Sequence, residues 1–203
     1  MKVDHKRTVP SYRATRGRFD VVEVPPLQYL ALDGSGDPNT SGDYRDAVTS
    51  LYPLAYGLRA LSRTELDRDH VVMPLEALWW SEDMSTFTTA RDASRWRWTL
   101  MIMVPDWLTA EHVERARADV AAGRGAGPSL DRVRLEGLVE GRCVQTLHVG
   151  PYDAEGPVLE EMHRRVIPEL GLRMTGRHHE VYLGDPRRVD AGRLRTLLRQ
   201  PVG

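Results

Sequence analysis

Residues 179–186 read His-Glu-Val-Tyr-Leu-Gly-Asp-Pro and place a carboxylate and a phenol two residues apart in a predicted β-strand. Side chains along a strand alternate between its two faces, so Glu180 and Tyr182 share one face. Val181 and Leu183 point to the other face and indicate that it belongs to the core. Glu180 and Tyr182 therefore either line a cleft or lie on a solvent-exposed polar face, which antiparallel sheets often have.

The composition is that of a soluble globular protein. The chain has 203 residues, of which 41% are hydrophobic and 28% charged, enough for one large domain or two small fused units. A net charge of -1 predicts no general attraction to nucleic acid or to an anionic membrane. We find no apolar run near the roughly 18 residues of a membrane span, and no signal-peptide core. The single cysteine, Cys143, excludes an intramolecular disulfide and fits a reducing compartment, so we expect a cytoplasmic protein.

The first half of the chain predicts one strand-helix-strand-strand unit. Basic residues 1–18 lack periodicity and predict a flexible N-terminal arm before this unit. The unit consists of an interrupted strand at 19–32, a helix at 41–62 that Pro53 should kink, and strands at 71–80 and 96–104 joined by a long polar loop.

A predicted helix at 109–123, with Thr109 as its N-cap, links this unit to a second one. A glycine-rich linker follows the helix and lacks the lysine and hydroxyl residue that end a phosphate-binding loop. The second unit consists of a strand at 133–149 that bends near Glu140 and Gly141, a helix with an apolar stripe from Val158 to Leu170, and strands at 178–183 and 194–199.

The second half, residues of about 131–200, thus repeats the element order of the first half, residues of about 19–104. Each half is too small to bury its helix and sheet alone, so the two should pack together. We therefore predict one α+β domain over residues 19–203. It should consist of two pseudo-symmetric repeats whose antiparallel sheets enclose a ligand cleft.

Five motifs follow one another in a set order: Pro74-Leu75-Glu76-Ala77-Leu78-Trp79-Trp80, Trp98-Thr99-Leu100-Met101-Ile102, His148-Val149-Gly150-Pro151-Tyr152 with Glu155, His179-Glu180-Val181-Tyr182-Leu183, and Leu197-Leu198-Arg199-Gln200-Pro201-Val202. Over residues 19–202 this order resembles the GyrI-like small-molecule-binding family, which is related to the effector-binding domains of multidrug-responsive regulators. The resemblance implies two repeats around a cleft with an acidic residue and aromatic walls. It also implies binding of hydrophobic, often cationic, small molecules. One subfamily hydrolyses cyclopropane-bearing DNA-alkylating natural products, which gives an alternative function.

Glu180 is the candidate for a counter-ion or an acid/base group, and Tyr182 is its candidate catalytic partner. The adjacent Trp79 and Trp80 must face opposite sides of their strand. Trp80 shares a face with Glu76, so we assign these two to the ligand cleft and Trp79 to the core.

Three further residues are candidates for ligand binding. Trp98 lies either in the cleft or in the core. Tyr152 and His148 either bring a hydroxyl and an imidazole to the cleft rim or hold a loop in place.

The histidines and the cysteine do not form a recognisable catalytic or metal-binding pattern. Cys143 and His148 lie on opposite faces of one predicted strand, which argues against a nucleophilic pair. His178 and His179 also face opposite sides and lack nearby ligands, so we predict no metal or other cofactor.

A DNA-binding regulator is a third hypothesis for the chain. Only about 18 residues precede the first predicted strand, too few for a helix-turn-helix. We therefore expect small molecules as partners, without direct nucleic-acid binding, and the oligomeric state stays open.

Overall fold

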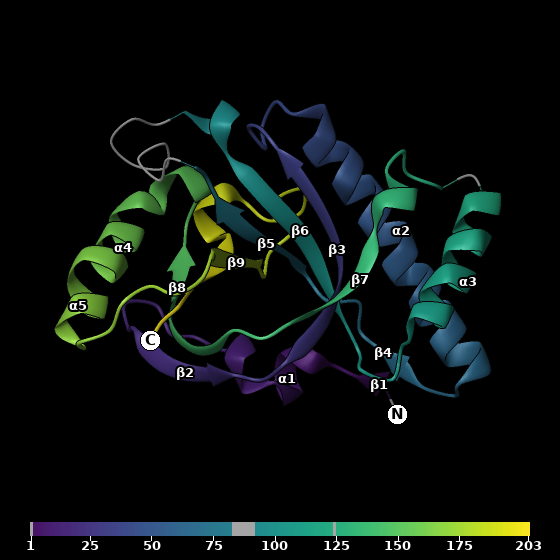
Figure 1. Ribbon diagram of the computed structural model, residues 1–203, viewed down its shortest axis with the longest axis horizontal. Helices are drawn as coiled ribbons and strands as arrows, with labels where there is room; N and C mark the ends of the chain where they lie inside the picture. Colours follow the sequence, from purple (N-terminus) through teal and green to yellow (C-terminus); the bar gives the residue numbers. More distant parts are fainter. Residues whose placement is uncertain (1, 83–91, 124) are drawn as a thin grey trace.

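The computed structural model describes residues 2–82, 92–123 and 125–203. Within these residues one large antiparallel sheet organises the chain (Figure 1). Its strands are β2 (Asp20–Val24), β3 (Leu27–Ser35), β5 (Leu75–Trp80), β6 (Arg97–Val104), β7 (Arg134–Leu138), β8 (Gly141–Val149), β9 (His178–Tyr182) and β10 (Arg195–Pro201). They lie in the order β2-β8-β10-β9-β5-β6-β3-β7. The α+β fold class is therefore confirmed.

The helices match the predicted boundaries closely at residues 42–65 and 110–122, whereas the first, at residues 5–8, was not predicted. They are α1 (His5–Thr8), α2 (Gly42–Glu65), α3 (Ala110–Ala122), α4 (Gly156–Glu161), a π-helical turn (Met162–Val166) and α5 (Ile167–Glu169). The Ser41 hydroxyl accepts the N–H of Tyr44 and begins α2, which continues through Pro53. Thr109 and His112 form the reciprocal cap of α3. A short parallel pair, β1 (Lys2–Val3) with β4 (Asp69–His70), lies apart from the main sheet.

The two repeats, β3-α2-β5-β6 and β8-α4-β9-β10, share this sheet. Strands β5 and β9 pair antiparallel at the centre, where Ala77 lies opposite Glu180. Each repeat also receives a strand from the other part of the chain, because β2 pairs with β8 and β7 pairs with β3. The expected two sheets are thus joined edge to edge into one, and the strand exchange interlocks the repeats.

The helices cover one face of the sheet in two groups. Leu51, Leu54 and Leu58 of α2 are fully buried together with Leu32 and Leu100 of the strands beneath. A separate cluster joins Met162 and Ile167 to Val144, Leu198 and Val202. Figure 1 shows α2 and α3 over one end of the sheet and α4 and α5 over the other. Amphipathic helices bury their apolar side in this way, which leaves the region between the two groups for a cleft.

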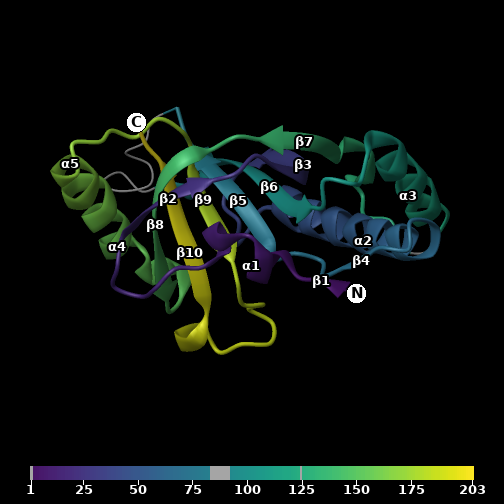
Figure 2. The same ribbon diagram turned by 90° about the horizontal axis from the view of Figure 1, so that it is seen from below.

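The N-terminal segment is not a flexible arm, so that prediction is wrong. Tyr12 is 4% exposed, and its hydroxyl donates to Glu76 Oε1 at 2.5 Å. Arg199 donates to the carbonyl oxygen of Ser11 at 2.7 Å. Figure 2 shows the segment with α1 crossing the sheet. The anchor is one tyrosine that inserts among distant strands, and a periodicity in the sequence cannot reveal such a contact.

The face of the sheet beneath this segment carries a buried ionic cluster of Glu76, Glu140, His179 and Arg199. His179 contacts Glu76 at 3.0 Å through Nε2 and Glu140 at 2.9 Å through Nδ1, and Arg199 contacts Glu140 at 2.8 Å. Burial alone would lower the pKa of His179, but Glu140 and Glu76 outweigh it and raise that pKa to about 9. The cluster therefore pairs two buried carboxylates with two cations.

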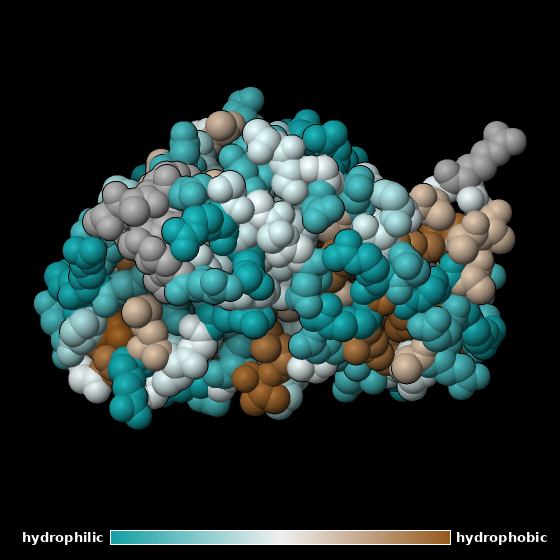
Figure 3. All heavy atoms as spheres, turned by 45° about the horizontal axis from the view of Figure 1, so that its top comes forward, coloured by the Kyte–Doolittle hydropathy of each residue, from teal (hydrophilic) through white to brown (hydrophobic). Residues whose placement is uncertain are grey.

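The surface in Figure 3 is mostly hydrophilic, with hydrophobic residues gathered in small separate patches. None of the helices in the described part of the chain combines the length and hydrophobicity needed to span a membrane. Most of the predicted polar loop after β5, residues 83–91, lies outside the described residues.

Candidate functional site: a carboxylate in an aromatic cleft

A large cleft lies on the helix-covered face of the sheet, with a volume of about 2480 Å³. Strands β5 and β9 contribute Trp79, Glu180 and Tyr182 to it. Tyr44 and Tyr52 of α2 line one side, and residues of α4 line the other. The cleft thus lies between the helices of the two repeats rather than between two sheets.

Glu180 is held by a chain of hydrogen bonds. The Tyr182 hydroxyl donates to Glu180 Oε2 at 2.7 Å, and Trp79 Nε1 donates to the Tyr182 oxygen at 3.1 Å. Burial and the charge of Glu180 raise the pKa of Tyr182 well above its ordinary value, so the phenol stays protonated. The ion-pair partner of Glu180 among the described residues is His178, at 3.5 Å. The Glu180 carboxylate is thereby oriented, and 13% of the Glu180 side chain is exposed.

Aromatic rings surround this carboxylate. Tyr44 stacks on Trp79 with ring centroids 6.5 Å apart and 16° between their planes. Tyr152 meets Tyr182 edge to face at 5.4 Å and is 38% exposed. Such rings offer flat apolar surfaces and electron-rich faces to a ligand.

Glu155, at the start of α4, is a second carboxyl group of the cleft, and sequence reasoning missed it as a site residue. It is 4% exposed. Burial and the negative charge of Glu180 raise the pKa of Glu155 to about 9, although the Thr196 hydroxyl opposes this shift. The group is therefore neutral at pH 7 and can donate a hydrogen bond. The sequence placed Glu155 inside a motif but gave no signal of its burial.

Three predicted ligand-binding residues lie outside the cleft. Glu76 is fully buried on the opposite face of the sheet, where Tyr12 and His179 occupy its carboxylate. Trp98 is also fully buried, and its ring lies over Gly34, where any Cβ would overlap it. His148 is 7% exposed, and its Nε2 lies 3.2 Å from the Pro151 carbonyl oxygen. The structure thus places Glu76 away from the cleft, against its predicted role, whereas Trp98 and His148 occupy the alternatives, core and loop contact, that the sequence left open.

Both adjacent tryptophans line the cleft, although the sequence assigned only Trp80 to it. Trp79 is buried, as predicted, but it also lines the cleft, because the pairing of Ala77 with Glu180 puts it on the Glu180 face. Trp80 lies on the other face of the strand and also lines the cleft, with the Arg177 guanidinium 3.6 Å from its ring centroid. Strand alternation predicts that the two rings face opposite sides of β5. Which ring shares a face with Glu180 depends on the register of β5 against β9.

The described residues hold no group of three or more histidine, cysteine, aspartate or glutamate side chains able to bind a metal ion. Burial raises the pKa of the Cys143 thiol to about 12, so the thiolate that a nucleophile requires is scarce at pH 7.

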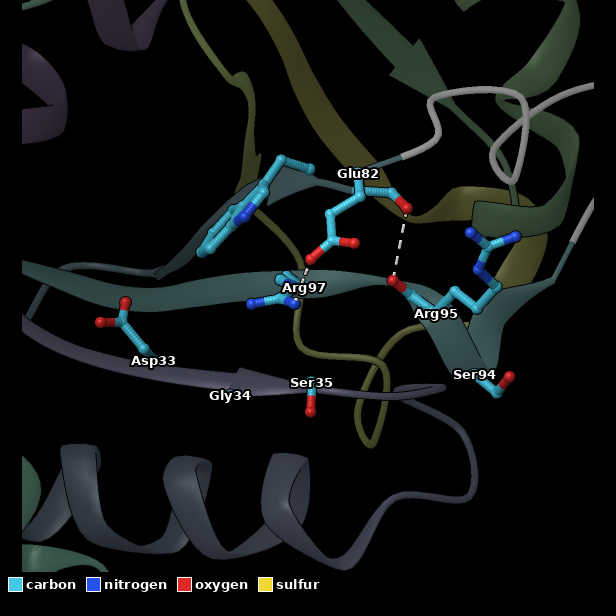
Figure 4. A pocket seen from close by; sticks show the side chains of 9 residues that line it. Asp33, Gly34, Ser35, Glu82, Ser94, Arg95 and Arg97 are labelled. Atoms are coloured by element: carbon cyan, nitrogen blue, oxygen red, sulfur yellow. Dashed lines mark hydrogen bonds and ion pairs between the residues drawn. The ribbon is translucent and has the colours of Figure 1, made fainter.

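A second, smaller recess of about 620 Å³ lies on the opposite face of the sheet beside Trp80. Figure 4 shows Asp33 and Ser35 of β3 near Arg97, which forms an ion pair with Glu82 at 2.6 Å. Because Arg97 and Glu82 neutralise each other, this recess presents a ligand with less unpaired charge than the cleft does.

A shared sheet of two repeats with a carboxylate in an aromatic cleft defines a protein built to hold a small molecule. The profile of the GyrI-like small molecule binding domain matches residues 18–202. The chain therefore belongs to the GyrI-like family.

Solved structures of similar proteins agree with this membership. An uncharacterized conserved protein from Listeria innocua is 36% identical, with 99% of this chain and 100% of that chain covered and a TM-score of 0.89. A hydrolase from Listeria innocua is 35% identical, with both chains covered in full and a TM-score of 0.87. The EcmrR C-terminal domain shares the fold alone, at 12% identity over 92% of this chain and 97% of that one, with a TM-score of 0.55. A search of curated proteins found no match.

Proposed function

We propose that this chain binds hydrophobic, often cationic, small molecules in the cleft and thereby serves in multidrug binding and protection against foreign compounds. The observation that carries the proposal is the carboxylate of Glu180, oriented by Tyr182 and framed by the rings of Tyr44 and Trp79. A cation over an aromatic face is stabilised by roughly 0.5 to 2 kcal/mol, and apolar burial contributes about 25 cal/mol per Å².

The size of the cleft supports a broad range of ligands. Its 2480 Å³ exceeds the roughly 300 to 1,000 Å³ of pockets for a single drug-sized molecule. Apolar burial and cation–π attraction depend little on direction, so flat ligands of different outline can bind with modest selectivity.

Isothermal titration with rhodamine 6G, a flat cationic dye, tests this proposal. Glu180→Gln keeps the shape and the acceptor for Tyr182 but removes the charge, so we expect affinity to fall about 10-fold or more. The matched control is Glu160→Gln, an exposed carboxylate of α4 that also lines the cleft. Equal dye affinity of wild type and Glu180→Gln would remove Glu180 from the site.

An alternative function is hydrolysis of a cyclopropane ring in DNA-alkylating natural products. Its support is the name of the 35% identical Listeria innocua protein, a hydrolase, together with the family resemblance. Glu180 would take a proton from water as the water oxygen bonds to a ring carbon. The strained carbon–carbon bond then breaks, its electrons move into the conjugated carbonyl, and the carbonyl oxygen takes up a proton from solvent while Glu180 returns its own proton to solvent, so the net change is the addition of one water. Tyr182 orients the carboxylate for this step.

Product analysis by chromatography and mass spectrometry separates the two functions. A general base contributes about 10² to 10⁴-fold, so Glu180→Gln should slow turnover by that factor, and Tyr182→Phe should slow it less. If wild type binds a cyclopropane-bearing compound but forms no more water adduct than buffer alone does, the hydrolase alternative is excluded and binding stands.

A further inference from the structure

The two sides of the cleft differ in chemistry. The side formed by α2 and β5 presents aromatic rings, among them Tyr44, Tyr52 and Trp79. The side formed by α4 and β9 presents Glu155, His163, His178 and Glu180. A purely apolar cation would use the aromatic side and Glu180, and it would leave the remaining polar groups without a role.

Three of these side chains each have a buried polar atom without a hydrogen-bond partner. Oε1 of Glu155, Nε2 of His163 and Nδ1 of His178 form no hydrogen bond within the described part of the chain. Glu155 and His178 are 4% and 8% exposed, respectively. A buried polar atom without a hydrogen bond costs about 1 to 3 kcal/mol, so proteins rarely retain several in one place without a use for them.

These three side chains line the same side of the cleft, and two of them, His163 and Glu155, are neutral at pH 7. The rings of His163 and His178 meet edge to face with centroids 5.8 Å apart. Burial, together with the neighbouring His178, lowers the pKa of His163 to about 4, so this imidazole is neutral at pH 7. Glu155 is neutral as well, because burial and Glu180 raise its pKa to about 9. A buried neutral carboxyl group can donate a hydrogen bond that a carboxylate cannot.

We propose that Glu155, His163 and His178 form a polar subsite that binds an uncharged hydrogen-bond acceptor of the ligand, such as a carbonyl oxygen. The inference rests on the proposed binding function of the cleft and specifies its ligand class. The ligand is a flat aromatic body that packs against Tyr44 and Trp79 and carries its carbonyl group toward α4. Glu155 donates its carboxyl proton to that oxygen, and Glu180 remains available to a positive charge elsewhere on the ligand.

The test compares xanthone with xanthene, which share a tricyclic skeleton and differ by one carbonyl group. Titration of the full chain should give wild type a preference of about 3- to 10-fold for xanthone, the value of one net hydrogen bond. Glu155→Leu should abolish this preference. Glu155→Gln, whose amide group still donates, should largely keep it.

Two further variants keep the test decisive if Glu155→Leu fails to fold. His163→Leu should also reduce the preference for xanthone. Glu161→Leu makes the same kind of change at an exposed position of α4 outside the cleft and should leave the preference unchanged.

The possible outcomes separate this inference from the function on which it rests. Equal binding of xanthone and xanthene by wild type, with rhodamine 6G still bound, overturns the polar subsite alone. A preference for xanthone that survives in both Glu155→Leu and His163→Leu overturns it as well. Failure of all three probes to bind wild type overturns the proposed function itself.

Discussion

Strand β9 carries the buried ionic cluster on one face and the cleft on the other. His179 faces the cluster, where it contacts Glu76 and Glu140, and Arg199 adds a second positive charge. Glu180, the next residue, faces the cleft, where a tyrosine hydroxyl and a histidine 3.5 Å away are its partners. His179 and Glu180, neighbours in one strand, thus lie in different environments: a buried ionic network and a ligand cleft.

The difference lies in how completely each face satisfies its own charges. In the cluster each carboxylate has a cationic partner, so a buried network that would otherwise be unfavourable becomes a rigid anchor for Tyr12. Among the described residues of the cleft, Glu180 has only a tyrosine hydroxyl and one histidine 3.5 Å away as partners, and several buried polar atoms form no hydrogen bond. Groups left unsatisfied within a stable fold are available to a ligand, whereas groups already paired contribute to stability.

The largest expected effect follows from His179→Leu. This change leaves Glu76 and Glu140 buried without the cation between them, so the free energy of unfolding should fall by about 3 to 5 kcal/mol. Urea unfolding followed by circular dichroism measures this loss. Glu180→Gln serves as the control from the other face of β9 and should change stability by less than about 1 kcal/mol. Similar losses for the two variants would contradict the division between the faces.

The pH dependence of the free energy of unfolding should also distinguish the cleft face, through Glu155, from the cluster face, through His179. Glu155 has a pKa of about 9 in the fold against 4.5 ordinarily, so between these values the folded state binds more protons than the unfolded state. Stability contributed by this group therefore falls as pH rises, by at most about 1.4 kcal/mol per pH unit. We expect the stability of wild type relative to Glu155→Gln to decrease from pH 5.5 to pH 8.

The raised pKa of His179 acts over a narrower range. Its contribution is complete below its ordinary pKa of 6.5 and is lost as pH rises toward 9. The stability of wild type relative to His179→Leu should therefore stay level up to about pH 6.5 and decrease above it. Urea midpoints at pH 5.5, 6.5 and 8 test both groups, and identical profiles for the two variants would refute this assignment.

The smallest expected effect concerns the rim of the cleft. Tyr152→Ala removes a partly exposed ring that packs on Tyr182, so affinity for rhodamine 6G and for xanthene should fall alike, by about 2- to 10-fold. Stability should change by no more than about 1 kcal/mol, because the ring is 38% exposed. A loss confined to the cationic dye would show that Tyr152 acts through its π face alone rather than as wall area.

Local patterns in the sequence predicted the repeated element order, the boundaries of α2 and α3, and the shared face of Glu180 and Tyr182. The hydrogen bond between those two side chains confirms the last point. These features depend on residues a few positions apart, through helical spacing, capping and strand alternation, so a single sequence contains the information.

Only the tertiary structure decided which of the remaining candidates reach the cleft. The register of β5 against β9 brings Trp79 to the Glu180 face and turns Glu76 toward Tyr12 and His179. The burial that makes Glu155 neutral likewise arises where α4 packs over the sheet. Each of these outcomes depends on contacts between residues far apart in the chain, and the local spacing of residues, which is what the sequence displays, does not encode them.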